Sequence, residues 1–258
     1  MSQNLEISNL SLALSTLLIM LAVSVDFKEK IGLSKDIIIS AVRAVVQLFI
    51  IGYVLAFVFK IDNFFLTLVM VAFMIFNASY HAHKTSKGIA NSFRTSLLSI
   101  GIGTSLALMI LVFSGTLDWV PSQIVPITGM ISSSAMTTIG VIYRTLTTQF
   151  NDRRQQVQEK LALGATSKQA SHSILRDSIR IGMMPAISST KTVGLVSLPG
   201  MMSGLMFAGI DPTHAIRYQI VVMFMMISVA TISSFIASYL SYQTFFNEQL
   251  QLEVPITK

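Results

Sequence analysis

Methionines and a proline–glycine pair are the residues of this sequence whose chemistry would suit a metal ion inside an apolar protein. The chain has 15 methionines, and thioethers are ligands for soft metals such as copper(I). Pro199-Gly200 precedes Met201-Met202 within an apolar run, where proline and glycine leave backbone groups free to line a cavity. Met130 lies in an earlier apolar run. Plainer roles stay open, because methionine also fills gaps in cores and a proline can simply kink a helix.

Two cations also fall within or beside apolar runs. Arg43 and Gln47 are four residues apart, so a helix places them on one face. Arg43 and Lys191 could line a pathway or face an anion. They could equally lie near the ends of their runs and extend their charged groups to the membrane surface. Both interpretations remain open.

Acidic and imidazole groups are missing from the middle of the apolar runs. No Asp or Glu lies inside a run, and the four histidines fall in loops or at run ends. Proton- and cation-coupled transporters usually carry such a group at mid-membrane, so this class is disfavoured. A chain without cysteine excludes disulfides and thiolate metal sites. No nucleophile–base pair occurs in the runs, which makes an enzyme the least favoured class.

The apolar runs themselves predict an all-α, multi-pass membrane protein. Only 12% of the residues are charged and 52% are hydrophobic, against roughly 25% charged in soluble domains. A membrane-spanning helix needs about 20 apolar residues. We expect about seven spans, the sixth interrupted by Pro199-Gly200: Leu10–Val25, Ile37–Phe59, Phe64–Tyr80, Leu97–Phe113, Ile124–Tyr143, Thr192–Gly209 and Ile216–Phe246. The whole chain, 1–258, is expected to form a single membrane domain.

The distribution of positive charge predicts which side of the membrane each loop faces. Fourteen Lys and Arg residues lie in the first, third and fifth loops and at the C-terminus, whereas only Lys60 and Arg217 lie toward the other side. Positive loops stay in the cytoplasm. The N-terminus is therefore expected outside and the C-terminus inside a multi-pass protein of the plasma membrane. This distribution accounts for the net charge of +6 without nucleic acid as a partner.

The fifth loop, residues 144–184, is the one sizeable polar segment. Its first part, Thr147–Leu163, favours a helix that Gly164 interrupts. Thr166 and Gln169 have the spacing of a capping box for a second helix, and apolar residues follow at helical spacing. We expect a cytoplasmic helix–turn–helix. A small-residue corner of this kind suits close contact with another protein, although a merely solvated amphipathic loop stays open.

The corner of this loop resembles a known docking motif. Glu159, Ala162, Gly164 and Ala165, with Pro185 some twenty residues later, look like the cytoplasmic coupling loop of ABC-transporter permeases, which docks into an ATPase subunit. Alanines directly follow the glutamate in the importer signature, whereas Lys160 and Leu161 do so here. The resemblance implies that Glu159, Ala162, Gly164, Ala165 and Thr166 contact an ATPase.

A longer resemblance covers most of the chain. The sequence is similar to the bacterial Fet-type iron-export permeases and to their plant relatives linked to aluminium tolerance. Seven segments carry this similarity: Leu161–Thr166, Lys191–Met202, Asp211–Pro212, Tyr218–Val222, Arg43–Leu48, Gly52–Leu55 and Pro126–Met136. Departures occur at Ser132-Ser133-Ser134, where the family has a Gly-Asn pair, at Ser188, where Asn is usual, and at Leu205, a commonly polar position.

The resemblance implies the permease subunit of an ATP-driven exporter of iron or an iron-related species. The chain has no Gly-x-x-x-x-Gly-Lys-Ser/Thr segment to hold phosphates, so it is expected to be no enzyme and to hold no cofactor. ATP and magnesium would bind a separate cytoplasmic ATPase, and a permease homodimer is expected. Eight residues are the candidates for a pathway or gate: Arg43, Gln47, Met130, Lys191, Pro199, Gly200, Met201 and Met202.

Two other functions remain open from the residues alone. One is a transporter or channel that works without ATP, and the other is a membrane scaffold that recruits a partner through residues 144–184. Metal ligands are not assigned, because iron prefers imidazole, carboxylate or thiolate and the expected mid-membrane region has none. Either a chelate is moved, or backbone carbonyls and methionines at the Pro199 break hold the ion.

Overall fold

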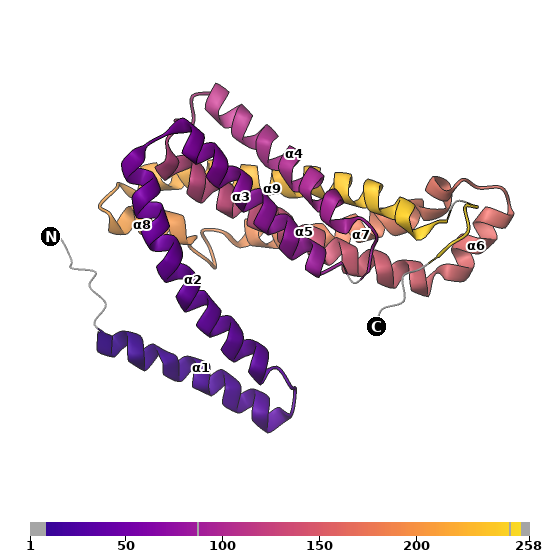
Figure 1. Ribbon diagram of the computed structural model, residues 1–258, viewed down its shortest axis with the longest axis horizontal. Coiled ribbons are helices and arrows are strands. Elements are labelled where there is room, and N and C mark those ends of the chain that lie inside the picture. The colour runs from indigo at the N-terminus through magenta and orange to yellow at the C-terminus, as the bar shows by residue number, and fades with distance from the viewer. Residues whose placement is uncertain (1–8, 87, 248, 254–258) are drawn as a thin grey trace. The chain divides into compact units, whose positions relative to one another are not determined.

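A computed structural model describes residues 9–86, 88–247 and 249–253 (Figure 1). These residues form nine α-helices and a terminal 3-10 turn. Two compact units divide the chain at Ile61. The expectation of a single membrane domain for 1–258 stays a prediction.

The first unit is a pair of helices, α1 (Asn9–Glu29) and α2 (Ser34–Ile61). Both helices are apolar and mostly exposed, as expected for surfaces solvated by lipid. Asp26 holds the turn between them, because its carboxylate accepts hydrogen bonds from the Leu33 backbone N–H (2.9 Å) and the Ser34 hydroxyl. The carboxylate at the end of α1 therefore has a structural role in the turn.

The second unit is built around α5 (Pro121–Asp152), which packs against α3 (Phe64–Lys84), α4 (Ser92–Phe113), α7 (Ser167–Thr192) and α9 (Pro212–Ser241). One face of α5 is fully buried, from Ile131 through Ile142 to Phe150. Its 32 residues span about 48 Å, more than the roughly 30 Å of a hydrocarbon core. The helix therefore extends beyond a membrane-spanning length toward the polar loop.

Gly182 allows the close packing of α7 on α5. A Cβ at Gly182 would meet the Ile142 side chain and lie 3.3 Å from the Thr138 carbonyl oxygen. Apolar membrane helices pack through such close approaches, because lipid offers no hydrophobic gain from association. The position of α7 beside α5 thus depends on glycine at 182.

We expect Gly182→Ala to lower the free energy of unfolding by roughly 1–3 kcal/mol, the usual cost of overpacking. Thermal or SDS-induced unfolding of the purified protein measures the change. Ile142→Ala serves as the partner variant, since it removes the side chain that the new Cβ would meet. The double variant should lose less stability than the two single losses combined, and simple additivity would contradict the proposed clash.

The polar loop folds as a helix–turn–helix, with two details that the sequence did not predict. α5 continues to Asp152, and α6 (Arg154–Ala162) follows a junction at Arg153, so the expected helix over Thr147–Leu163 is two helices. Arg153 forms a 2.9 Å ion pair with Asp177 of α7 at this corner.

The expected capping box at the start of α7 is confirmed. Gln169 N–H donates to the Thr166 hydroxyl (3.3 Å), and Thr166 N–H donates to Gln169 Oε1 (2.9 Å). Ile174, Leu175 and Met183 are buried, so α7 also packs through the predicted apolar face.

The interrupted sixth span is a break rather than a kink. α7 ends at Thr192, residues 193–199 are non-helical, and α8 (Gly200–Phe207) begins after Pro199. Within the break, Val196 N–H donates to the Thr192 carbonyl (2.9 Å) and Gly194 has φ +82°. Pro199 supplies the fixed φ that starts α8.

α5 and α9 pack against each other and run in the same direction, and α7 packs against both and runs in the opposite direction (Figure 1). The chain therefore returns along the bundle through α7 and reaches α9 through α8. Asp211 is the N-cap of α9, and hydrogen bonds from the hydroxyl and N–H of Thr213 hold the pKa of its carboxyl below its usual value.

Six described helices are long and apolar enough to cross a membrane: α1, α2, α3, α4, α5 and α9. The predicted all-α, multi-pass class is confirmed. α7 is too polar and α8 too short for this criterion, so a seventh crossing and the N-outside orientation stay predictions.

Candidate functional site

A cavity of about 460 Å³ opens within the second unit, where the break between α7 and α8 faces α5 and α9. α5 supplies Met130 and four hydroxyl side chains, those of Ser133, Ser134, Thr137 and Thr138. Its full lining is Met130, Ser133, Ser134, Thr137, Thr138, Pro185, Ala186, Ser189, Val193, Ser197, Pro199, Gly200, Met201, Gln219, Val222, Met223 and Met226. The volume falls within the range of small-molecule sites, roughly 300–1,000 Å³.

Four of the predicted pathway residues line this cavity: Met130, Pro199, Gly200 and Met201. Pro199 and Gly200 therefore border a cavity, and a role for the four residues in a pathway or gate stays a prediction. Met202, the neighbour of Met201, is 8% exposed and lies outside the lining.

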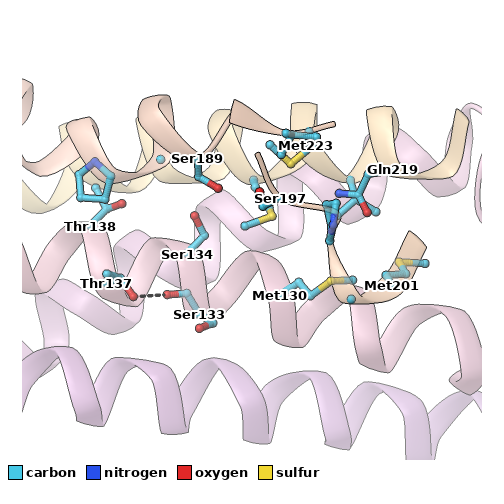
Figure 2. Close-up of a pocket in the computed structure, with 17 residues that line it drawn as sticks. Met130, Ser133, Ser134, Thr137, Thr138, Ser189, Ser197, Met201, Gln219 and Met223 are labelled. Atoms are coloured by element: carbon cyan, nitrogen blue, oxygen red, sulfur yellow. Dashed lines mark hydrogen bonds between the residues drawn. The ribbon is translucent and has the colours of Figure 1, made fainter. Parts of the chain in front are cut away.

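The lining of the cavity is mostly apolar, with hydroxyl groups and one amide among the apolar side chains (Figure 2). Hydroxyls of Ser134, Ser189 and Ser197 face a space that also contains the Met130, Met201 and Met223 side chains. No Asp, Glu, Lys, Arg or His belongs to its described lining. Within the described residues, no group of three or more His, Cys, Asp or Glu could hold a metal ion.

α9 also lines the cavity, through four residues that were not among the predicted pathway residues: Gln219, Val222, Met223 and Met226. Gln219 is 5% exposed, and none of the described residues hydrogen-bonds to its Oε1 atom. A glutamine inside an otherwise apolar span was the available signal, because polar groups in membrane helices usually face the protein interior.

The other predicted pathway residues lie elsewhere. Lys191 is exposed in the last turn of α7 and is not part of the lining. Arg43 and Gln47 are exposed on α2, within the first unit. Roles for these three residues in a pathway stay predictions.

The predicted ATPase contacts surround the turn between α6 and α7. Glu159, Ala162, Gly164 and Thr166 are exposed and Ala165 is half-buried. Gly164 has φ +89°, and its N–H donates to the Leu161 carbonyl (3.0 Å). This left-handed glycine closes α6 as in a Schellman motif.

Leu163 is the apolar residue at the tip of this turn. It follows the end of α6 and is 88% exposed. Because it lies in the polar loop and outside the apolar spans, lipid does not account for this exposure. Val157 of α6 is buried in the core, whereas Leu163 is left exposed at the tip. An exposed leucine beside small residues is suited to contact with another protein.

A second hollow of about 510 Å³ lies beside this turn and was not predicted. It is lined by Arg154, Gln158, Leu161 and Ala165 on one side and by the C-terminal residues Gln249, Leu250, Gln251 and Leu252 on the other. Stacking of Phe245 on Phe150, with ring centroids 4.3 Å apart, attaches the start of this C-terminal segment to α5.

These helices and this cavity define a multi-pass protein of the plasma membrane. The chain belongs to the uncharacterised protein family UPF0014, whose sequence profile matches residues 9–246. It is a membrane permease of that family, and thus a transport protein rather than an enzyme.

The relatives span nearly the full chain. The sequence is 50% identical over 249 residues, 96% of each chain, to "Probable iron export permease protein FetB" of Escherichia coli. It is 35% identical over 244 residues to "Protein ALUMINUM SENSITIVE 3" of Arabidopsis thaliana, covering 95% of this chain and 89% of the relative. It is 36% identical over 238 residues to "UPF0014 membrane protein STAR2" of rice, covering 92% and 84%. No solved structure matches the chain.

Proposed function

We propose that this chain is the permease subunit of an ATP-driven transporter of the ABC class that exports iron or an iron-related species. A separate cytoplasmic ATPase binds the turn between α6 and α7 and holds ATP and Mg²⁺. The relative named as a probable iron export permease, 50% identical over nearly the whole chain, supports the substrate class. Two permeases complete the transporter.

The geometry of the α6–α7 turn carries the ATPase part of the proposal. It presents Leu163 and the small residues Gly164 and Ala165 at an exposed corner. The Arg153–Asp177 ion pair and the capping box hold this corner in one shape. A fixed, exposed, partly apolar corner can transmit movement of a partner to α7, which lines the cavity through Ser189.

Seven crossings fit the direction of the helices. Because α5 and α9 run the same way (Figure 1), α7, the break and α8 supply a return crossing between them. Discontinuous helices of this kind form substrate sites near mid-membrane in other transporters. The cavity is open rather than enclosed, which favours a second permease copy as its missing wall.

We expect the α6–α7 turn in the cytoplasm and the α8–α9 connection outside. The chain has no cysteine, so single cysteines report topology without background. In intact cells, Thr213→Cys should react with a membrane-impermeant maleimide, whereas Thr166→Cys should react only after permeabilisation. The reverse pattern would contradict the N-outside orientation.

Transport into inside-out membrane vesicles tests the function. Vesicles that contain the permease and its candidate ATPase should accumulate iron when ATP is supplied, and a non-hydrolysable ATP analogue should not support accumulation. Accumulation without the ATPase would identify an ATP-independent transporter. ATPase binding without accumulation of any iron species would favour a scaffold.

A further inference from the structure

Four methionine side chains from three helices border the same cavity. Met130 belongs to α5, Met201 to α8, and Met223 and Met226 to α9. The fold brings these residues together from distant parts of the sequence, and the break before α8 positions Met201. Figure 2 shows Met130, Met201 and Met223 around the space.

Gln219 adds an oxygen donor to this cluster. The residue is only 5% exposed, and its Oε1 has no hydrogen-bond partner among the described residues. Gln219, Met223 and Met226 follow at i, i+4 and i+7 on α9, which places all three on one helix face. A buried acceptor without a partner is unfavourable unless a ligand occupies the site.

The chemistry of these donors is that of a soft-metal site. Thioethers and an amide carbonyl are uncharged electron-pair donors, and thioethers select soft ions such as Cu(I). Harder divalent ions prefer carboxylate, imidazole or water. The described lining has no carboxylate or imidazole, so it would bind a hard ion weakly.

We propose that the cavity contains a binding site for a soft monovalent metal ion, of the class of Cu(I) and Ag(I). The thioethers of Met130, Met201, Met223 and Met226 coordinate the ion, and Gln219 Oε1 supplies an oxygen donor. Binding of the ion requires neither the ATPase nor transport, so the test of this site is independent of the test of the proposed function.

Silver binding by the purified full-length permease tests the site, because Ag(I) is not oxidised in air as Cu(I) is. Equilibrium dialysis in chloride-free buffer, with metal analysis of both chambers, gives affinity and stoichiometry. The cavity variant replaces Met130, Met201, Met223 and Met226 with leucine, which keeps the side-chain volume close to that of methionine. The control variant replaces four methionines outside the lining, Met20, Met109, Met184 and Met206, with leucine.

The wild type and the control variant should bind Ag(I) tightly at one shared site. The cavity variant should lose this site or bind Ag(I) there at least roughly tenfold more weakly. A tenfold excess of Zn(II), a divalent ion that cannot reduce Ag(I), should leave the bound Ag(I) in place. Equal binding by the cavity and control variants, or displacement by Zn(II), would overturn the proposal. If the fourfold variant does not fold, the pair Met130→Leu and Met226→Leu is compared with Met109→Leu and Met184→Leu by the same criterion.

Discussion

Replacing Gly164 with tryptophan should abolish association of the permease with its ATPase and, with it, ATP-driven transport. A Cβ at Gly164 would meet no atom within 4 Å, so the indole extends into open space at the tip of the α6–α7 turn. It would cover the small-residue corner beside Leu163 that the proposed partner must approach. Co-purification of the tagged permease with the ATPase measures the loss.

Gly164→Ala is the matched control for this prediction. Gly164 has φ +89°, where any side chain is disfavoured by about 1–2 kcal/mol, so both variants share this backbone cost. Only the tryptophan adds bulk at the surface. We expect Gly164→Ala to retain most of the ATPase and both variants to keep the same unfolding temperature. Normal co-purification of the ATPase with Gly164→Trp would show that this turn is not the docking site.

Replacing Ser189 with tryptophan should stop transport while leaving the ATPase bound. Ser189 lies on α7 and faces the cavity (Figure 2), and it is exposed. An indole there would occupy much of a 460 Å³ space without displacing buried core residues. Substrate uptake by inside-out vesicles, compared with ATPase co-purification from the same membranes, separates the two effects.

Ser188→Trp controls for the bulk of the new side chain. Ser188 is the preceding residue on α7, is also exposed, and does not line the cavity. Its side chain points about 100° away from that of Ser189 around the helix. Transport should persist in Ser188→Trp and fall by at least roughly tenfold in Ser189→Trp. Equal transport by the two variants would show that substrate does not pass through this cavity.

Local signals allowed parts of the fold to be predicted from the sequence. The capping box of Thr166 and Gln169 involves residues three positions apart, and Pro199 and Gly200 indicated an interruption before α8. They did not indicate that the non-helical segment begins already at residue 193. Apolar length predicted about seven spans, and six of them correspond to helices of membrane-spanning length. Each of these features depends on neighbouring residues, which is why sequence spacing was enough.

The composition of the cavity could be predicted only in part, because it depends on helix rotation and packing. Met201 and Met202 are about 100° apart around a helix, and a non-helical break resets the rotation of α8, so the sequence could not decide which of them faces the cavity. α9 is apolar on most sides, which left its Gln219 face without a periodic signal. The C-terminal residues beside Ala165 depend on a fold-back that no local motif predicted.

ATP turnover by the purified permease and its candidate ATPase, reconstituted in lipid, tests the central claim most directly. We predict that the ATPase binds the permease and that its turnover rises when ferrous iron or an iron chelate is present, and only with the permease. Absence of ATPase association, or turnover that the permease does not change, would contradict an ATP-driven transporter coupled through the α6–α7 turn.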